Sequence, residues 1–240
     1  MINFIIPMAG RGSRFKNSGY KVPKWLIMVN GKTLLEWSIY SLPLNLSNKL
    51  IFIALRSEAE EFGLARFLKS TFAPIIDIEI ILIKEPTQGQ SEKALYSKNF
   101  ANANIPIGIF NIDTKFSSST LENAIKNANI DGVLGSFKSK SNRFSYAKLD
   151  INQNVIETAE KLVISENALT GFYSFKDPFD FYNAAYEQIS RRETINDEYY
   201  IAPLYNNLIR MGKKYSIDNV TSIDILGTPE ELENFKIKNR

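Results

Sequence analysis

The sequence of 240 residues contains no cysteine and no histidine. The absence of cysteine excludes disulfide bonds, thiolate metal sites and cysteine nucleophiles. The absence of histidine excludes a Ser-His-Asp triad, histidine-ligated zinc and a histidine general base. Any chemistry must therefore depend on carboxylates, lysine, arginine, hydroxyl groups, backbone amides or a hard metal ion.

Long apolar segments are missing as well. The apolar stretch from Met1 to Met8 is only eight residues long, whereas spanning a bilayer takes about 20, and no signal-peptide cleavage pattern follows it. Hydrophobic residues make up 44% of the chain and charged residues 23%, which is ordinary for a globular protein and excludes a disordered or collagen-like chain. We therefore expect a cytoplasmic protein without membrane insertion.

Acidic side chains are absent from the first part of the chain. The overall balance of 29 basic and 26 acidic residues argues against a nucleic-acid-binding protein. Before Glu36, however, only basic residues occur: Arg11, Arg14, Lys16, Lys21, Lys24 and Lys32. This local excess predicts a positive field that attracts a polyanion, with a solvated basic face as the alternative.

Short apolar runs alternate with helical periodicity in the first half. The predicted buried strands are Ile2–Met8, Leu50–Leu55, Ile78–Ile83, Ile107–Ile112 and Gly132–Phe137. The predicted helices are Thr33–Leu42, Glu58–Lys69, Ser91–Ala101 and Thr120–Ala128. This order predicts an α/β fold with a Rossmann-like, mainly parallel mixed sheet flanked by helices.

The pattern changes after about Lys138 and predicts antiparallel additions. The expected elements are a hairpin of Ser145–Leu149 and Val155–Glu160, strands Gly171–Phe175 and Lys214–Ile217, helices Pro178–Ser190 and Glu198–Met211, and a terminal helix opening at Thr228-Pro229. No linker or repeat interrupts the sequence. We therefore predict a single domain, 1–240, with halves 1–137 and 138–240.

A glycine-rich, basic loop follows the first predicted strand, with the sequence Pro7-Met8-Ala9-Gly10-Arg11-Gly12-Ser13-Arg14-Phe15. The carboxyl ends of strands are where an open α/β sheet binds ligands. Gly10 and Gly12 let backbone amides approach an anion closely, and the neighbouring arginines supply positive charge. The Rossmann and Walker fingerprints are both absent, because Phe15 and Leu26 stand where those motifs need glycine.

Two further segments continue this pattern, Pro23-Lys24-Trp25-Leu26 and the helix entry Gly31-Lys32-Thr33. Together with the glycine-rich loop they resemble the sugar-phosphate nucleotidyltransferase superfamily, and within it a subgroup of short capsule-biosynthesis nucleotidyltransferase-like proteins. Further matches are Asn111-Ile112-Asp113, Val155 to Lys161, Glu198-Tyr199-Tyr200, Pro203 to Asn206 and Gly227-Thr228-Pro229-Glu230. The resemblance covers nearly the whole chain and implies a GT-A-like fold.

The resemblance also implies a reaction. Superfamily members join a nucleoside triphosphate to a phosphorylated sugar or alcohol and release pyrophosphate. A nucleotide-binding half would then be 1–137 and an acceptor-binding half 138–240. Because the substrate phosphate is already a nucleophile, catalysis needs orientation and charge neutralisation rather than a general base. A chain without histidine loses nothing in such a reaction.

Three catalytic residues are implied by the resemblance. Arg14 matches an arginine that holds the triphosphate, Lys24 a lysine that neutralises charge near the α-phosphate, and Asp113 an aspartate that binds Mg²⁺. The alternatives are surface salt bridges for the two cations, disfavoured by the lack of acidic residues before Glu36, and a strand-end cap for Asp113. The implied nucleotide-binding residues are Met8, Ala9, Gly10, Arg11, Gly12, Ser13, Lys84 and Gly89.

On the acceptor side, Glu160 and Lys161 match a Glu-Lys pair that contacts the sugar hydroxyls and the acceptor phosphate, and Gly171 follows in the same half. Many relatives place a second metal-binding aspartate where Ile225 stands here. Either a bulge delivers the neighbouring Asp224 to the metal, or water and phosphate fill that coordination position.

Two departures from the superfamily limit the substrate prediction. Lys84 replaces the base-reading glutamine of uridylyl- and thymidylyltransferases, which leaves CTP, UTP, dTTP and GTP open, with a preference for pyrimidines. Leu169 replaces an asparagine that binds an acceptor hydroxyl or N-acetyl group. That change argues against an N-acetylhexosamine 1-phosphate and permits a smaller or unusual acceptor.

The leading hypothesis is an Mg²⁺-dependent nucleotidyltransferase that makes an activated precursor for capsule or another surface polysaccharide, with a homodimer as a plausible assembly. One alternative is a GT-A-type glycosyltransferase that uses a nucleotide sugar. Its usual D-x-D motif is missing, because Asp113 is flanked by Asn111 and Lys115. The other alternative is a non-catalytic, nucleotide-sensing homologue, which retention of both Arg14 and Lys24 disfavours.

Overall fold

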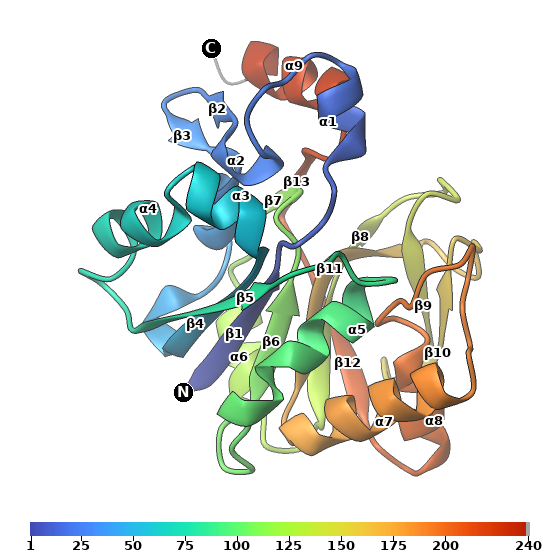
Figure 1. Cartoon of the computed structure of the whole chain (residues 1–240). Helices are drawn as coiled ribbons and strands as arrows, with labels where there is room; N and C mark the ends of the chain where they lie inside the picture. The colour runs from blue at the N-terminus through green and yellow to red at the C-terminus, as the bar shows by residue number, and fades with distance from the viewer. Residues whose placement is uncertain (239–240) are drawn as a thin grey trace.

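A mixed sheet of nine strands forms the centre of the computed structural model, which describes residues 1–238 (Figure 1). Its strands are β1 (Ile2–Pro7), β4 (Ser47–Leu55), β5 (Ile78–Ile83), β6 (Ile107–Phe110), β8 (Gly132–Lys138), β9 (Ser145–Leu149), β10 (Val155–Glu160), β11 (Asn167–Phe175) and β12 (Tyr215–Asn219). The main path runs β10-β9-β11-β6-β1-β4-β5, and β8 pairs with both β11 and β12. Strands from both halves of the chain therefore share one sheet.

The two halves contribute different pairings to this sheet. Strands β6, β1, β4 and β5 are parallel neighbours. In contrast, β11 is antiparallel to β6 and β8, and β9 and β10 form an antiparallel hairpin. This confirms the predicted α/β class, with a mainly parallel first half and antiparallel additions in the second. The division into one domain with boundaries 1–240 stays a prediction.

Helices cover both faces of the sheet and bury its strands. They are α2 (Leu34–Ile39), α3 (Arg56–Glu61), α4 (Leu64–Thr71), α5 (Gln90–Ala94), α6 (Leu121–Lys126), α7 (Pro178–Ser190) and α8 (Leu204–Arg210), whereas α1 (Ser13–Asn17) and α9 (Pro229–Lys238) lie outside the sheet. All six residues of β1 are buried: Ile5 packs on one face of the sheet and Phe4 on the other. Burial on both faces explains why the parallel strands are continuous apolar runs rather than alternating ones.

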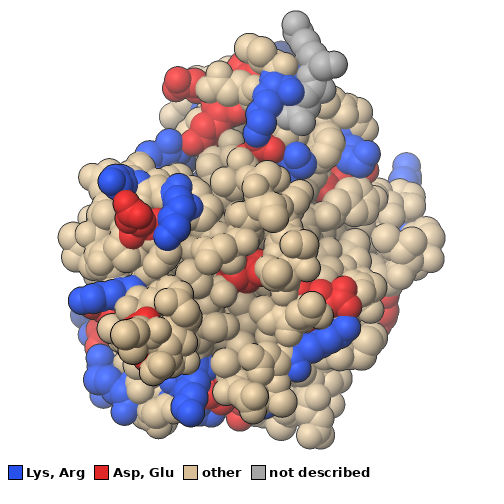
Figure 2. Space-filling view, turned by 180° about the vertical axis from the view of Figure 1, so that it is seen from behind, with Lys and Arg blue, Asp and Glu red and all other residues tan. Residues whose placement is uncertain are grey.

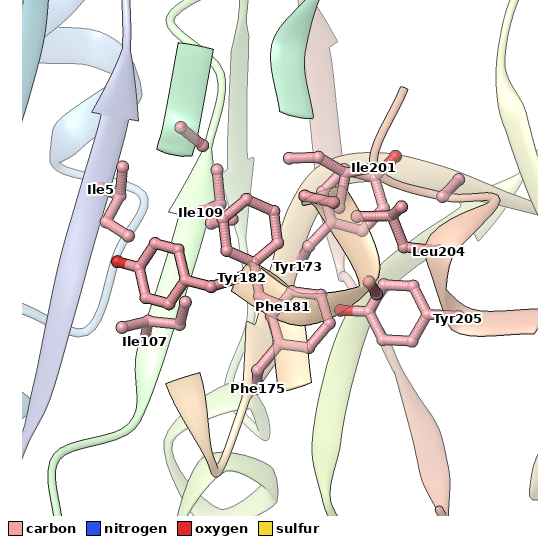
Figure 3. Close-up of a cluster of buried hydrophobic side chains, with 14 of the residues drawn as sticks. Ile5, Ile107, Ile109, Tyr173, Phe175, Phe181, Tyr182, Ile201, Leu204 and Tyr205 are labelled. Carbon is pink, nitrogen blue, oxygen red and sulfur yellow. The ribbon is translucent and has the colours of Figure 1, made fainter. Parts of the chain in front are cut away.

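The core on one face lies between the sheet and helices α5, α7 and α8. Figure 3 shows Ile5, Ile107 and Ile109 from the strands facing Phe181 and Tyr182 of α7. Beyond them, aromatic rings of β11 and α8 lie against each other, with the Phe175 and Tyr205 ring centroids 4.8 Å apart. The opposite face packs against α2, α3, α4 and α6.

A third, smaller core supports the glycine-rich loop from outside the sheet. It joins α1, α9 and a short hairpin of β2 (Met28–Val29) and β3 (Lys32–Thr33), and includes Phe15, Leu34 and Phe235. Figure 1 shows α9 lying beside α1, so the C-terminal helix lies against the segment that follows the glycine-rich loop. The C-terminal helix therefore helps to hold the loop that follows β1.

Several element predictions were wrong in detail. The helix predicted over 58–69 is two helices, because Gly63 has a φ of 66° and separates α3 from α4. The helix predicted over 91–101 continues after Ala94 as a 3-10 helix, Leu95–Phe100. The pair β7 (Thr114–Ser117) and β13 (Ser222–Ile225) was not predicted, because these strands are too short and polar to show a hydrophobic pattern.

The helix predicted from Glu198 to Met211 begins only after Pro203. Upstream of it, Tyr199 instead pairs with the loop at Gly89 in an isolated parallel bridge. The amide of Tyr199 donates to the Gln88 carbonyl at 3.0 Å, and the amide of Ser91 donates to the Tyr199 carbonyl at 3.1 Å. A contact between distant segments thus replaces the first turns of the expected helix.

Charged side chains are interspersed on the face shown in Figure 2, where lysine and arginine alternate with aspartate and glutamate among uncharged residues. That face has no continuous basic surface of the kind that binds nucleic acid. Among residues 1–238, no helix has the length and apolar character needed to cross a bilayer.

Candidate active site

The predicted site residues follow strands β1 and β6, at the carboxyl ends of the parallel sheet. These strands are hydrogen-bonded neighbours with Ile5 opposite Ile109. The segment after β1 is the glycine-rich loop, and the segment after β6 contains Asn111 and Asp113. Because parallel neighbours end at the same edge, the topology places the loop and the aspartate side by side.

The glycine-rich loop combines a buried start with an exposed, basic continuation. Met8 and Ala9 are buried, and the Met8 amide donates to the Ile53 carbonyl at 2.9 Å. Gly12 has a φ of 59° at the start of α1, a left-handed conformation that favours glycine. The side chains of Arg11 and Arg14 are exposed and form no ion pair with any residue in 1–238. Two arginines beside exposed loop backbone are suited to bind an anion.

Lys24 and Asp113 form an ion pair, with 3.2 Å between Lys24 Nζ and Asp113 Oδ2. Lys24 lies on a 3-10 helix anchored by the buried Trp25, and its ammonium lies 5.7 Å from the Phe15 ring centroid. The salt bridge that the sequence disfavoured for Lys24 does form, because an acidic residue distant in sequence lies close to it in space. The partner comes from the end of a different strand, and the contact joins two residues with implied catalytic roles.

Lys16 likewise finds a distant partner, Glu58, at 2.9 Å. Lys21 is exposed and has no ion pair within the described part of the chain. The six cations before Glu36 are therefore not one diffuse surface, since at least two of them have specific partners.

The acidic residues around the loop do not gather into a ready metal cage. No group of three or more Asp or Glu able to hold a metal ion occurs among residues 1–238. Asp224 Oδ2 lies 3.1 Å from Lys115 Nζ and its Oδ1 lies 2.6 Å from Lys238 Nζ. Both lysines hold the pKa of Asp224 below its ordinary value, although burial opposes them. Lysines at both oxygens would compete with a metal for this carboxylate.

The C-terminal segment approaches Asp113 through its backbone. The Leu226 amide donates to the Asp113 carbonyl at 2.7 Å, and a Cβ on Gly227 would lie 3.8 Å from Asp113 Oδ2. The Asp113 side chain is 39% exposed, so its carboxylate is accessible to a ligand. Mg²⁺ is commonly held by one or two carboxylates together with substrate phosphates. Asp113 with bound phosphates fits that pattern, whereas Asp224 is occupied by lysines.

A second loop borders the site, between β5 and α5. Lys84 is exposed directly after β5 and forms no ion pair with a described residue. Gln90 donates a hydrogen bond to Asn111, which joins this loop to the segment carrying Asp113. Gly89 lies so close to Tyr199 that a Cβ there would be 2.4 Å from both the backbone nitrogen and oxygen of Tyr199. The glycine is thus required by packing, whatever contact it makes with a base.

We expect Gly89→Ala to displace this loop. Its Cβ would meet backbone atoms that cannot rotate away, so the variant should lose about 1–3 kcal/mol of stability and bind nucleotide more weakly. Gly19→Ala is the matched control, because its φ of 86° adds strain while no atom lies within 4 Å of the new Cβ. Chemical denaturation and nucleotide titration of both variants measure the effect. Equal losses of stability in the two variants, together with an unchanged nucleotide affinity of Gly89→Ala, would contradict the expected displacement of the loop.

The implied acceptor residues form a second group on the hairpin side. Ser145 donates to Glu160, and the Tyr173 hydroxyl lies 3.2 Å from Ser145 Oγ. Lys161 Nζ donates to the Tyr200 hydroxyl at 2.5 Å and lies 4.7 Å from the centroid of the same ring. This arrangement offers a carboxylate, an ammonium and hydroxyl groups, which suits a phosphorylated polyol or sugar.

Gly171 connects the two groups at a bulge of β11. It has a φ of 88°, and a Cβ there would lie 2.7 Å from Asn111 Nδ2. Any other residue would be strained and would push against the asparagine that also binds Gln90. The contribution of Gly171 is therefore to allow close approach of β11 to the segment after β6.

Glu160 should make stability depend on pH. Burial raises its pKa above the ordinary 4.5, although Ser145 and Lys161 oppose the shift. The folded protein then binds more protons than the unfolded one between 4.5 and the raised value, so the free energy of unfolding falls as pH rises through that window. Urea unfolding across this range should show that the free energy of unfolding falls less steeply with pH in Glu160→Gln than in the wild type. The exposed Glu157→Gln on the same strand is the control, and identical slopes in both variants would count against the assignment.

Sequence reasoning missed two charged residues near these groups. Lys93 lies in α5 near Gly10, and it was treated only as part of the helix predicted over 91–101. Glu198 was quoted within a matching segment without a role, yet it raises the pKa of Glu160 and of Tyr200. Their spacing along the chain gives no signal, since the tertiary structure alone brings these segments together.

Comparison with known proteins supports the resemblance to nucleotidyltransferases. No family model and no curated protein matches the sequence, whereas solved structures match over its whole length. A nucleoside-diphosphate-sugar pyrophosphorylase from Vibrio cholerae RC9 is 29% identical, with a TM-score of 0.82 and coverage of 98% of this chain and 99% of that chain. The chain belongs to the sugar-phosphate nucleotidyltransferase superfamily. The resemblance inferred from the motifs is thereby confirmed at the level of the superfamily.

Two more distant structures have the same nucleotidyltransferase fold. A protein assigned as a glucose-1-phosphate thymidylyltransferase from Bacillus anthracis, solved in complex with a sucrose, is 19% identical, with a TM-score of 0.83 over 100% of this chain and 95% of that chain. The inositol-1-phosphate CTP transferase from T. maritima is 14% identical, with a TM-score of 0.76 over 99% and 96%. At these identities the likeness concerns the fold alone, and the capsule-biosynthesis subgroup stays a prediction.

Proposed function

We propose that this chain is an Mg²⁺-dependent nucleotidyltransferase that joins a nucleoside triphosphate to a phosphorylated sugar or sugar-like alcohol. In this reaction an oxygen of the acceptor phosphate bonds to the α-phosphorus, the bond to the β-phosphate breaks, and pyrophosphate leaves. The Lys24–Asp113 contact beside the glycine-rich loop is the observation on which the proposal depends. It puts a cation and an accessible carboxylate where the triphosphate would lie.

The residues around this contact have distinct tasks. Arg14 and the loop backbone would bind the triphosphate, and Lys24 would neutralise negative charge that grows at the α-phosphate. Asp113 would hold Mg²⁺, which supplies further charge neutralisation on the phosphate oxygens when bound. In the free protein the Lys24–Asp113 pair at 3.2 Å holds the two side chains together beside the glycine-rich loop.

The acceptor group defines the second substrate. Lys161 would bind the acceptor phosphate, and Glu160 with neighbouring hydroxyls would accept and donate hydrogen bonds to the polyol. Names of the similar proteins include a nucleoside-diphosphate-sugar pyrophosphorylase and an inositol-1-phosphate CTP transferase, which supports a phosphorylated polyol as the acceptor class. We further propose a pyrimidine nucleotide as donor and an activated surface-polysaccharide precursor, such as one for capsule, as product.

A pyrophosphate-release screen tests this proposal. CTP, UTP, dTTP and GTP are each combined with a panel of sugar and alditol phosphates in the presence of Mg²⁺, and we expect release with one nucleotide and one acceptor class. Sugar transfer from a nucleotide sugar without pyrophosphate release would instead indicate a glycosyltransferase. Nucleotide binding with no turnover across the panel would indicate a non-catalytic homologue.

A further inference from the structure

Lys93 is a partly buried lysine whose ammonium points at the glycine-rich loop. A Cβ placed on Gly10 would lie 3.9 Å from Lys93 Nζ. The residue sits on the first turn of α5, where its amide donates to the Gly89 carbonyl at 3.2 Å. The backbone of Lys93 is thus held by the Gly89 loop, while its ammonium lies near the glycine-rich loop.

The ammonium of Lys93 makes no hydrogen bond or ion pair with any residue in 1–238. Burial lowers its pKa, and the negative charges of Glu198, Asp113 and Glu92 oppose that shift. An ammonium has three donors, and leaving them unmatched in a partly buried place is unfavourable. Such a group would gain from an anionic ligand that enters the cleft.

The position of Lys93 complements that of Lys24. A Cβ on Gly12 would lie 3.9 Å from Lys24 Cβ, so each of the loop's two glycines has a lysine beside it. Lys24 pairs with Asp113, whereas Lys93 follows the Gly89 loop, which pairs with Tyr199 of the second half. Lys93 therefore stands where segments of the two halves meet, with its ammonium near the glycine-rich loop.

We propose that Lys93 is a phosphate-binding residue that contacts the nucleotide's phosphate chain beside Gly10, near the point where the Gly89 loop pairs with Tyr199. The inference rests on the proposed function, since it takes the glycine-rich loop to be the triphosphate site. A lysine that only supported folding would affect stability but not polyphosphate affinity, and this difference makes the proposal testable.

The test measures binding of inorganic tripolyphosphate with Mg²⁺ by calorimetry, which needs neither the nucleobase nor the acceptor to be known. Lys93→Met keeps the length and apolar stem of the side chain, and it should weaken binding about tenfold or more, as expected for loss of hydrogen bonds to a charged group. Lys93→Arg should recover part of the affinity. The control is Lys98→Met in the following 3-10 helix, where Lys98 packs 4.5 Å from the Tyr186 ring centroid, and it should bind as the wild type does.

Thermal unfolding of each variant separates binding from folding. Weaker binding by Lys93→Met with a near-native melting temperature supports the proposal, even if the wild type releases no pyrophosphate with any nucleotide. Wild-type affinity in Lys93→Met overturns it, even if the wild type is an active nucleotidyltransferase. Should Lys93→Met unfold, the charge-compensated pair Lys93→Met with Glu198→Gln provides the folded variant, and unchanged tripolyphosphate affinity there would equally overturn the proposal.

Discussion

Asp113→Ala should abolish Mg²⁺-dependent pyrophosphate release, with a loss of at least about 10²–10³-fold. Asp113 is the accessible carboxylate at the carboxyl end of β6, and its Oδ2 lies 3.2 Å from Lys24 Nζ. The substitution removes the proposed metal ligand and also leaves Lys24 without its ion-pair partner. The initial rate of pyrophosphate release over a series of Mg²⁺ concentrations measures the effect.

A matched control for Asp113→Ala lies at the opposite end of the sheet. Asp77 Oδ2 pairs with Lys49 Nζ at 3.1 Å, and Asp77 immediately precedes β5. Asp77→Ala therefore removes an ion pair of similar length far from the cleft. Exposed pairs contribute little stability, so this control should retain both fold and activity. Full activity of Asp113→Ala at saturating Mg²⁺ would refute the assignment of Asp113.

Asp224→Asn distinguishes the two ways of completing the metal site. Its carboxylate is bound by Lys115 and Lys238, so we expect a lower melting temperature and an unchanged Mg²⁺ dependence of the rate. With that result, water and phosphate would complete the coordination of a metal held by Asp113. A marked rise in the Mg²⁺ concentration needed for half-maximal rate would instead identify Asp224 as a second ligand.

Lys24→Ala should reduce kcat about 10²–10³-fold, because the role proposed for Lys24 is to neutralise charge that develops at the α-phosphate. Arg14→Ala should weaken nucleotide binding as well, since an exposed arginine without an ion pair in the described chain is free to hold the triphosphate before and during reaction. Both kcat and nucleotide affinity are measured at one fixed salt concentration. Lys24→Ala should therefore act mainly on kcat, whereas Arg14→Ala should act on nucleotide affinity as well.

Lys21→Ala and Lys16→Ala are the controls for this pair. Lys21 is exposed without an ion pair among the described residues, and Lys16 pairs with Glu58 on the surface. Both should tolerate alanine with nearly unchanged kcat and affinity. Four small, similar losses that disappear at moderate salt would mean that the loop is only a diffuse basic surface, and the nucleotidyltransferase proposal would lose its main support.

The sequence by itself predicted most strands and helices of the central sheet and the glycine-rich loop after β1. Strand β5 and helix α7 have the predicted bounds, because a short isoleucine-rich segment and a proline at the first helical turn are local signals. The Gly10-to-Arg14 segment after β1 is also local, since its glycines and arginines are adjacent in the chain. Such signals need no knowledge of tertiary contacts.

Only the tertiary structure decided which charged groups meet. Asp113, the partner of Lys24, and Lys115, a partner of Asp224, are far from them in sequence, so the lack of acidic residues before Glu36 did not exclude an ion pair of Lys24. The charge of Glu198 acts on the pKa of Lys93 because the neighbouring Tyr199 pairs with the Gly89 loop instead of continuing a helix. Electrostatic interactions depend on distance in space, and residues so far apart along the chain are brought together by packing, which a sequence pattern does not record.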